Sequence, residues 1–303
     1  MNIIRPVSID DSVLTSSNVT EADKPEFSLV TSYALDAEVM VTTDGVHSIY
    51  VSLKSSNVGN QPEDDDPVTP VNWARKSATN RWAMFSSQIN DQTQRAGEIV
   101  IVLDASSLVD GVAFFNLDAQ SITISVDDPV DGIVYNKTIQ LIDNSGVNDW
   151  FSWYFEPITR QKVSGVLDLP PYANATITIT ITNTGGTAKC GVFTFGAQRK
   201  LGDTDFGTGI GIVDYSRKER DTFGNPVTVK RNFAKRANYS VTANTNYVST
   251  IQNTLSDLRT VDMAWIGSVD YPSTIIFGYY KDFDVILSNY TKSQLSIEVE
   301  GLT

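Results

Sequence analysis

The chain has 303 residues, of which 36 are acidic and 23 are basic, giving a formal net charge of -13. This acidity argues against a protein that binds nucleic acid over its whole surface, because phosphate contacts rely on clustered Lys and Arg. The charged fraction is only 19%, and Thr, Val, Ile and aromatic residues recur in short runs. These features predict a mainly β protein of two or three domains.

Reactive and metal-binding residue types are scarce, since Cys190 is the only cysteine and His47 the only histidine. An internal disulfide therefore cannot form, and zinc sites and His-based triads lack their usual residues. The chain begins without an apolar signal region, and no stretch approaches the roughly 18 apolar residues that cross a bilayer. We expect synthesis into the cytosol, with no catalytic residue, no metal, no cofactor and no membrane insertion.

Residues 1-78 form the first predicted unit, an N-terminal arm followed by a small aromatic β-module. Its rings and turn residues follow one another in the order Phe27, Tyr33, Val39, Tyr50, Gly59, Pro62 and Trp73. A unit this small uses large rings either as its whole core or for display to a ligand. The order resembles the carbohydrate-binding modules of the chitin-binding type, and this resemblance implies contact with sugar. We predict that Tyr33, Tyr50 and Trp73 form the core and that Phe27 is the exposed sugar-binding ring.

An acidic run in the same unit, Glu63 to Asp66, lies between Pro62 and Pro67. We predict a solvated loop. Clustered oxygens also suit Ca²⁺, but the run lacks the alternating spacing of a dedicated calcium loop, so we predict no metal there.

Residues 79-200 are predicted to form a β-sandwich. Short apolar runs recur at 99-103, 112-117, 122-126, 133-141, 151-155, 175-181 and 191-195. Residues 175-182 alternate strictly between apolar residues and Thr, as in a strand with one buried face. Turn signals such as Asp131-Gly132 separate the runs. Seven or eight short strands of this kind predict a jelly-roll-like sandwich, with a closed barrel as the alternative.

One of these predicted strands carries an aromatic cluster from Trp150 to Phe155. In a strand, alternation places Trp150 and Tyr154 on one face and the other rings on the opposite face, so at most one set is core. We predict Trp150 and Tyr154 as sugar-binding residues if their set is exposed. The alternative is a packing or interface role.

Residues 201-303 are predicted to form a linker and a small C-terminal α+β docking domain. The Gly-rich segment Gly202 to Gly211 suggests a flexible linker. An apolar stripe at helical spacing predicts a helix from Thr245 to Arg259. Strands are predicted at 227-233, 263-266, 274-277, 283-287 and 294-299.

A basic band crosses this acidic chain between positions 217 and 236. It consists of Arg217, Lys218, Arg220, Lys230, Arg231, Lys235 and Arg236. Such a band predicts docking on an acidic protein partner through complementary charge. The alternative is that these side chains pair with the chain's own carboxylates.

Three further segments, taken together with the N-terminal module, carry a resemblance to known proteins that covers most of the chain. They are the junction Asn80 to Phe85, the turn Leu169 to Ala173 and the block Asp214 to Lys218. In this order the parts resemble a group of tailed-bacteriophage virion proteins. The resemblance implies a non-enzymatic component of the tail or neck appendage, present in multiple copies, that binds other virion proteins and is assembled in the host cytoplasm.

Two other functions remain open. The first is a dedicated receptor module that binds a host-surface polysaccharide. The second is a glycan-degrading enzyme, which needs only two carboxylates at a suitable separation. No neighbourhood of the sequence singles out such a pair.

Overall fold

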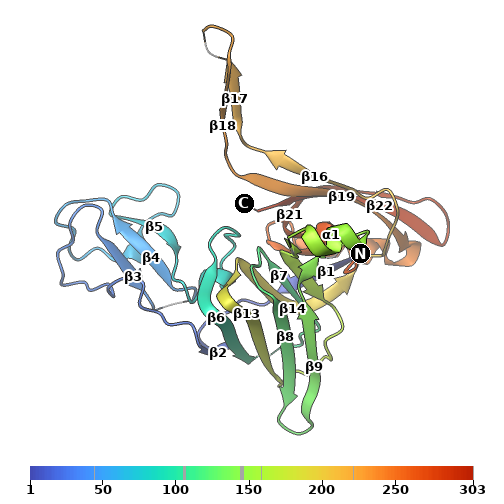
Figure 1. Cartoon of the computed structure of the whole chain (residues 1–303), viewed down its shortest axis with the longest axis horizontal. Helices are drawn as coiled ribbons and strands as arrows, with labels where there is room; N and C mark the ends of the chain where they lie inside the picture. The colour runs from blue at the N-terminus through green and yellow to red at the C-terminus, as the bar shows by residue number, and fades with distance from the viewer. Residues whose placement is uncertain (44, 105–106, 144–146, 158, 221, 303) are drawn as a thin grey trace.

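The computed structural model describes the chain except for residues 44, 105-106, 144-146, 158, 221 and 303. The protein is mainly β, as predicted, and its strands form two large antiparallel sheets and three small ones (Figure 1). The largest sheet has ten strands. Their order is β12 (Val163–Val166), β7 (Gly111–Phe115), β14 (Val192–Lys200), β1 (Asn2–Pro6), β20 (Met263–Ile266), β21 (Ile275–Ile286), β22 (Lys292–Gly301), β19 (Phe233–Asn244) and β15 (Asp203–Thr204), with β16 (Gly209–Asp214) also paired to β19.

The second sheet has five strands and packs on one end of the first. Its order is β2 (Leu14–Ser17), β6 (Thr93–Asp104), β13 (Thr176–Cys190), β8 (Ser121–Asp128) and β9 (Gly132–Gln140). The predicted alternation in β13 is confirmed, because Ile177, Ile179 and Ile181 are buried while the Thr residues between them are not. These isoleucines share a core with Phe114 and Phe195 of the opposite sheet, which makes this part a β-sandwich.

The first strand joins the sandwich to the C-terminal part of the chain. β1 pairs with β14 on one side and with β20 on the other, so it lies inside the large sheet. The segments 1-78, 79-200 and 201-303 therefore all contribute strands to one sheet. Gly196 permits the close approach of β14 to β1, since a Cβ at this position would lie 1.9 Å from the carbonyl oxygen of Arg5.

The aromatic module forms a separate three-stranded sheet beside the body of the protein (Figure 1, blue to cyan). Its strands are β3 (Glu38–Val41), β4 (Ser48–Ser52) and β5 (Trp73–Ala78), and the loop between β4 and β5 contains the short helix η1 (Pro62–Asp64). A second short helix, η2 (Ala83–Phe85), begins the connection to β6.

The predicted C-terminal helix is confirmed as η3 (Thr245–Tyr247) followed by α2 (Val248–Asp257). Ile251, Leu255 and Leu258 are buried against the large sheet and form one core with residues of β19 to β22. The two strands predicted at 274-277 and 283-287 are a single strand, β21, which follows the short helix η4 (Pro272–Thr274). No helix among the described residues has the length and apolar character needed to span a membrane.

The prediction of a flexible linker at 202-211 is wrong. Parts of this segment form β15 and β16, which pair with β19. The long strand β19 offers twelve residues of backbone to pair with, and this tertiary partner overrides the flexibility suggested by the glycines.

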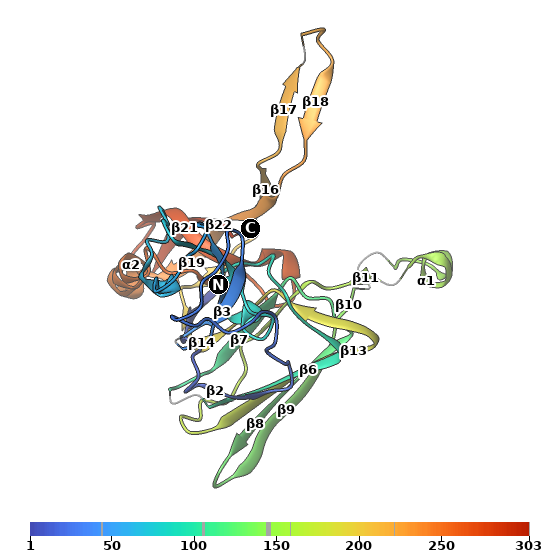
Figure 2. The ribbon, with the colours of Figure 1, turned by 90° about the vertical axis from the view of Figure 1, so that its left-hand side faces the viewer.

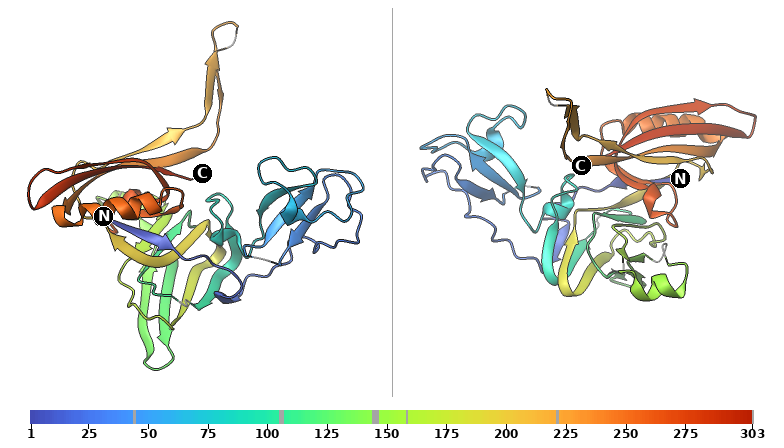
Figure 3. Two further views of the ribbon diagram at one scale, coloured as in Figure 1. Left: turned by 180° about the vertical axis from the view of Figure 1, so that it is seen from behind. Right: turned by 45° about the horizontal axis from the view of Figure 1, so that its top comes forward.

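Two elements project from the body. The hairpin of β17 (Arg217–Arg220) and β18 (Pro226–Val229) stands out beyond the large sheet in every view (Figures 1 and 3), and we call it the arm. The helix α1 (Trp150–Phe155) lies at the end of a stalk made by β10 (Ile142–Asp143) and β11 (Thr159–Arg160) (Figure 2). The strand predicted at 227-233 is wrong in its extent, because pairing stops at Val229 and resumes in β19 at Phe233.

Candidate functional site

The rings of the N-terminal module contact one another. Trp73 is 1% exposed, and its ring centroid lies 5.2 Å from that of Tyr33 and 5.6 Å from that of Phe27. The Trp73 indole Nε1 donates to the carbonyl oxygen of Asn60 at 2.9 Å. Trp73 is therefore core, as predicted, while Tyr33 and Tyr50 are half-buried. Phe27 stacks on Tyr33 and is also half-buried, so it is part of the same cluster and not a separate exposed ring.

The acidic run caps its own loop. The Asp65 carboxylate accepts from the backbone N–H groups of Asn72 at 3.0 Å and Trp73 at 2.6 Å. The Asp66 carboxylate accepts from those of Val68 and Thr69, and these bonds lower its pKa. Across the described residues, no three His, Cys, Asp or Glu side chains come together in a group that could hold a metal ion.

The single histidine lies where the module meets the body. His47 Nδ1 lies 2.8 Å from a carboxylate oxygen of Glu21, and Nε2 lies 3.2 Å from one of Asp11. The imidazole ring also packs on Trp82, with a centroid distance of 4.6 Å. These contacts give His47 a structural place at the junction.

The aromatic segment 150-155 is a helix, so its prediction as a strand is wrong. The Asp149 carboxylate accepts from the backbone N–H of Ser152 at 2.7 Å, and the Ser152 hydroxyl accepts from the backbone N–H of Asp149 at 3.2 Å. This reciprocal pair is a capping box, which starts a helix. The signal was present in the sequence, in the Asp149-to-Ser152 spacing, but the run of aromatic residues favoured a strand.

All five rings of this helix are exposed, so neither face of the segment is core. We call them the aromatic knob: Trp150, Phe151, Trp153, Tyr154 and Phe155. Trp150 and Tyr154, the two predicted sugar-binding residues, are 84% and 75% exposed and lie one helical turn apart. Exposed apolar patches of this kind are more frequent at sites of contact with other molecules than elsewhere on a protein surface.

The structure divides the basic band among the arm and its base. Arg217, Lys218 and Arg220 lie on β17, Lys230 and Arg231 follow β18, and Lys235 and Arg236 lie on β19. Lys218 pairs with Asp214 at 2.7 Å and Arg217 with Glu219 at 2.5 Å, so two of the seven cations are paired within the chain. The other five form no ion pair with any described residue.

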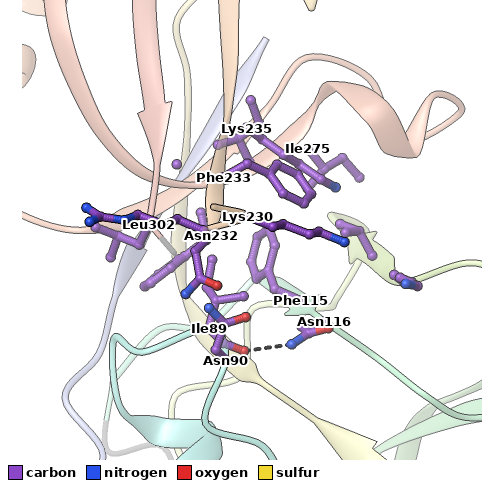
Figure 4. A pocket seen from close by; sticks show the side chains of 16 residues that line it. Ile89, Asn90, Phe115, Asn116, Lys230, Asn232, Phe233, Lys235, Ile275 and Leu302 are labelled. Atoms are coloured by element: carbon purple, nitrogen blue, oxygen red, sulfur yellow. Dashed lines mark hydrogen bonds between the residues drawn. The ribbon is translucent and has the colours of Figure 1, made fainter. Parts of the chain in front are cut away.

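A pocket of about 320 Å³ opens below the base of the arm (Figure 4). Its apolar wall consists of Ile89, Phe115, Val163, Phe233, Ile275, Ile276, Phe277 and Leu302. Its cations are Lys162, Lys230, Arg231 and Lys235, and no Asp or Glu is among its lining residues. Asn116 forms part of the rim and donates to the carbonyl oxygen of Ile89 at 2.8 Å. We call this the cationic pocket.

The charges in the pocket are close enough to affect one another. Although Lys235 keeps an exposed surface, the surrounding protein desolvates its ammonium group and, together with the charge of Lys162, lowers its pKa. An anion placed among these cations would favour the charged form of Lys235 and offset its repulsion by Lys162. Sequence reasoning found three of the four cations as part of the basic band, but Lys162 and the apolar wall come from distant segments that only folding brings together.

Comparison of this sequence with protein-family models and with curated proteins found no match.

Proposed function

We propose that the chain is a non-enzymatic structural component of a bacteriophage virion, located in the tail or neck appendage and docked there in multiple copies. Its partners are other virion proteins and further copies of itself, and it is assembled in the host cytoplasm. The observation that carries this proposal is the arm. A projecting hairpin with exposed strands suits a protein that contacts a neighbour in an assembly.

The arm lacks a core of its own. All eight residues of β17 and β18 are exposed, including the apolar side chains of Val227 and Val229. A two-stranded hairpin alone in water is marginally stable, and both of its edges leave backbone groups unpaired. A partner that covers the arm would supply the missing contacts.

The base of the arm is anchored to the large sheet. The Tyr215 hydroxyl donates to the Glu300 carboxylate at 2.5 Å, and the backbone N–H of Arg231 donates to the Ser216 hydroxyl at 3.1 Å. Lys281 forms an ion pair with the same carboxylate. The arm is thus held in a defined direction at its base, which suits an element that docks on a neighbour.

The test is to shorten the arm and count copies in the particle. Residues 219-227 are replaced by Asn-Gly, which forms a two-residue turn between Lys218 and Thr228. We expect the purified variant to keep its melting temperature and to be lost from virions, as measured by quantitative mass spectrometry. Full incorporation of a folded variant would contradict the proposal.

A sugar-binding receptor module is the second candidate function, favoured by the exposure of Trp150 and Tyr154 on the aromatic knob. Aromatic faces in such positions stack on apolar faces of ligands. If this reading holds, Trp150→Ala with Tyr154→Ala abolishes retention on immobilised host-surface polysaccharide. Phe27→Ala serves as the comparison for the N-terminal module, and equal retention by all three proteins would exclude both ring sets as the sugar site.

A further inference from the structure

The chain carries two surfaces of complementary chemistry that have no partner within the described residues. The aromatic knob is apolar and convex, and the acidic residues Asp149 and Glu156 flank it. The cationic pocket is apolar and concave, and cations surround it. We propose that the aromatic knob of one copy inserts into the cationic pocket of a second copy. This proposal rests on the multi-copy role proposed above and names one contact between the copies.

The pocket selects a ligand with two properties. Phe115, Ile275 and Phe277 offer an apolar surface, which favours a ring or another apolar group. The cations Lys162, Lys230, Arg231 and Lys235 have no carboxylate among the lining residues. A ligand that brings negative charge next to an apolar group satisfies both requirements.

The knob has both properties. Phe151 and Phe155 form one ring pair, with centroids 4.9 Å apart, and Trp150 and Trp153 form another at 5.9 Å. Glu156 follows directly after the rings and is exposed, with no ion pair among the described residues. A volume of about 320 Å³ is at the small end of ligand pockets and suits one or two side chains better than a large free ligand.

The insertion joins two copies because the knob projects away from its own body. The stalk of β10 and β11 carries α1 outward from the sheets (Figure 2). Lys162 of the pocket follows the stalk strand β11 by two residues. The pocket thus lies near the foot of the stalk and the knob at its far end.

One such contact buries less than the roughly 1,200 Å² typical of a stable interface. We therefore expect weak association in solution and a stronger effect where many copies are held together in the particle. A test must trap the contact and cannot depend on a stable dimer.

Disulfide trapping with engineered cysteines provides this test. Tyr154→Cys places a thiol on the knob, and Asn232→Cys places one on the pocket rim. The native Cys190 is buried and burial raises the pKa of its thiol, so it does not compete. We expect the mixed full-length variants, under mild oxidation at high concentration, to give a heterodimer on a non-reducing gel.

The matched control replaces the knob cysteine by Tyr290→Cys. Tyr290 is also an exposed tyrosine, but it lies in the turn between β21 and β22, away from the knob. Equal trapping by Tyr154→Cys and Tyr290→Cys, or no trapping by either, overturns the proposal.

A charge exchange tests the chemistry of the contact. Glu156→Lys on the knob variant, or Lys162→Glu on the pocket variant, should each lower the trapped fraction by about tenfold, as for a partly desolvated charge pair. Combining the two changes should restore trapping. Loss without restoration overturns the assignment of these two side chains to one contact.

The trapping result and the proposed function can fail separately. Shortening the arm leaves the knob and the pocket wall intact, so cysteine variants with the shortened arm should still form the trapped heterodimer. If no disulfide is trapped but shortening the arm still removes the protein from virions, only the knob-and-pocket contact is overturned. If pocket variants instead lose retention on an anionic polysaccharide while trapping is absent, the occupant is a free anionic glycan and the proposal is wrong.

Discussion

At the scale of single residues, Trp73 and Trp150 show that the same residue type has two different roles in this molecule, one in a core and one on the surface. Trp73 is fully buried under Phe27 and Tyr33, whereas Trp150 is exposed on the aromatic knob. Trp73→Ala deletes the centre of a small core, so we expect it to lower the free energy of unfolding of the module by about 3–5 kcal/mol. Trp150→Ala should change the free energy of unfolding of the protein by less than about 0.5 kcal/mol. Urea unfolding of the whole chain measures both changes, and similar losses would contradict this assignment of core and surface.

Glu300 gives the base of the arm a dependence on pH. The Lys281 ammonium, and after it the Tyr215 hydroxyl, hold the pKa of the Glu300 carboxyl below its usual range. A carboxylate with a lowered folded-state pKa contributes stability above the usual pKa, and this stability is lost as the pH falls through the folded-state value. We therefore expect protease cleavage at the base of the arm to increase in acid, below about pH 4.3.

Glu300→Gln separates this contribution from general acid effects, because the amide does not titrate. The variant should be cleaved faster than the wild type at neutral pH, and the difference between the two should shrink in acid. A difference that is constant across the pH range would mean that Glu300 does not anchor the arm.

At the scale of elements, the pattern of apolar residues in the sequence predicted those strands and helices that have one buried face. The alternation in β13 and the apolar stripe of α2 both specify one buried face, and both elements occur where they were predicted. Elements that depend on a distant partner were missed. β15 and β16 exist because β19 lies beside them, and the sequence of residues 202-211 carries no sign of that strand.

The features of the candidate site also fall into those that the sequence predicted and those that it did not. The basic band and the aromatic run were visible as composition, and the structure places the aromatic run on a projecting helix and the basic band on the arm and its base. The knob was assigned the wrong secondary structure because the aromatic residues outweighed the capping signal of Asp149 and Ser152. The cationic pocket could not be predicted, since its walls come from segments around residues 89, 115, 162, 232, 276 and 302.

The pairing of β1 with β14 leads to a prediction for Gly196. A side chain at this position would collide with the backbone of Arg5, so Gly196→Ala should displace β1 and cost about 1–3 kcal/mol of stability. Hydrogen exchange of the amides in residues 2-6 should increase. Gly209→Ala is the matched control, because the nearest atom to its added Cβ is 4.0 Å away. Unchanged exchange in the Gly196 variant would show that the sheet adjusts without cost.

At the scale of the whole molecule, we expect no hydrolysis of glycans or peptides by the purified chain. The single histidine is held between Glu21 and Asp11 at the junction of the module, and the acidic run caps a loop. Product analysis after incubation with host-surface polysaccharide measures this. Turnover that disappears when one carboxylate is replaced would make the protein an enzyme.

The last prediction concerns the direction in which the molecule docks. The arm and the module lie on different parts of the body (Figure 1), so docking through the arm and its base leaves the module free to face outward. Because β15 and β16 are strands of the large sheet, the arm's direction is set by that sheet and not by a flexible linker. Complementary charge then fixes orientation more than affinity.

Reversal of the unpaired cations at the arm's base tests this docking. Arg231→Glu with Arg236→Glu should reduce the number of copies per virion, since both side chains are exposed and form no ion pair within the described chain. The control is Arg199→Glu with Arg259→Glu, which makes the same change of net charge at two exposed sites away from the arm. Arg231 also lines the cationic pocket and Arg236 does not, so Arg236→Glu alone reports on the arm. Equal incorporation of the control and the test variants would mean that these basic side chains do not guide docking. Any contribution of the arm would then come from its backbone.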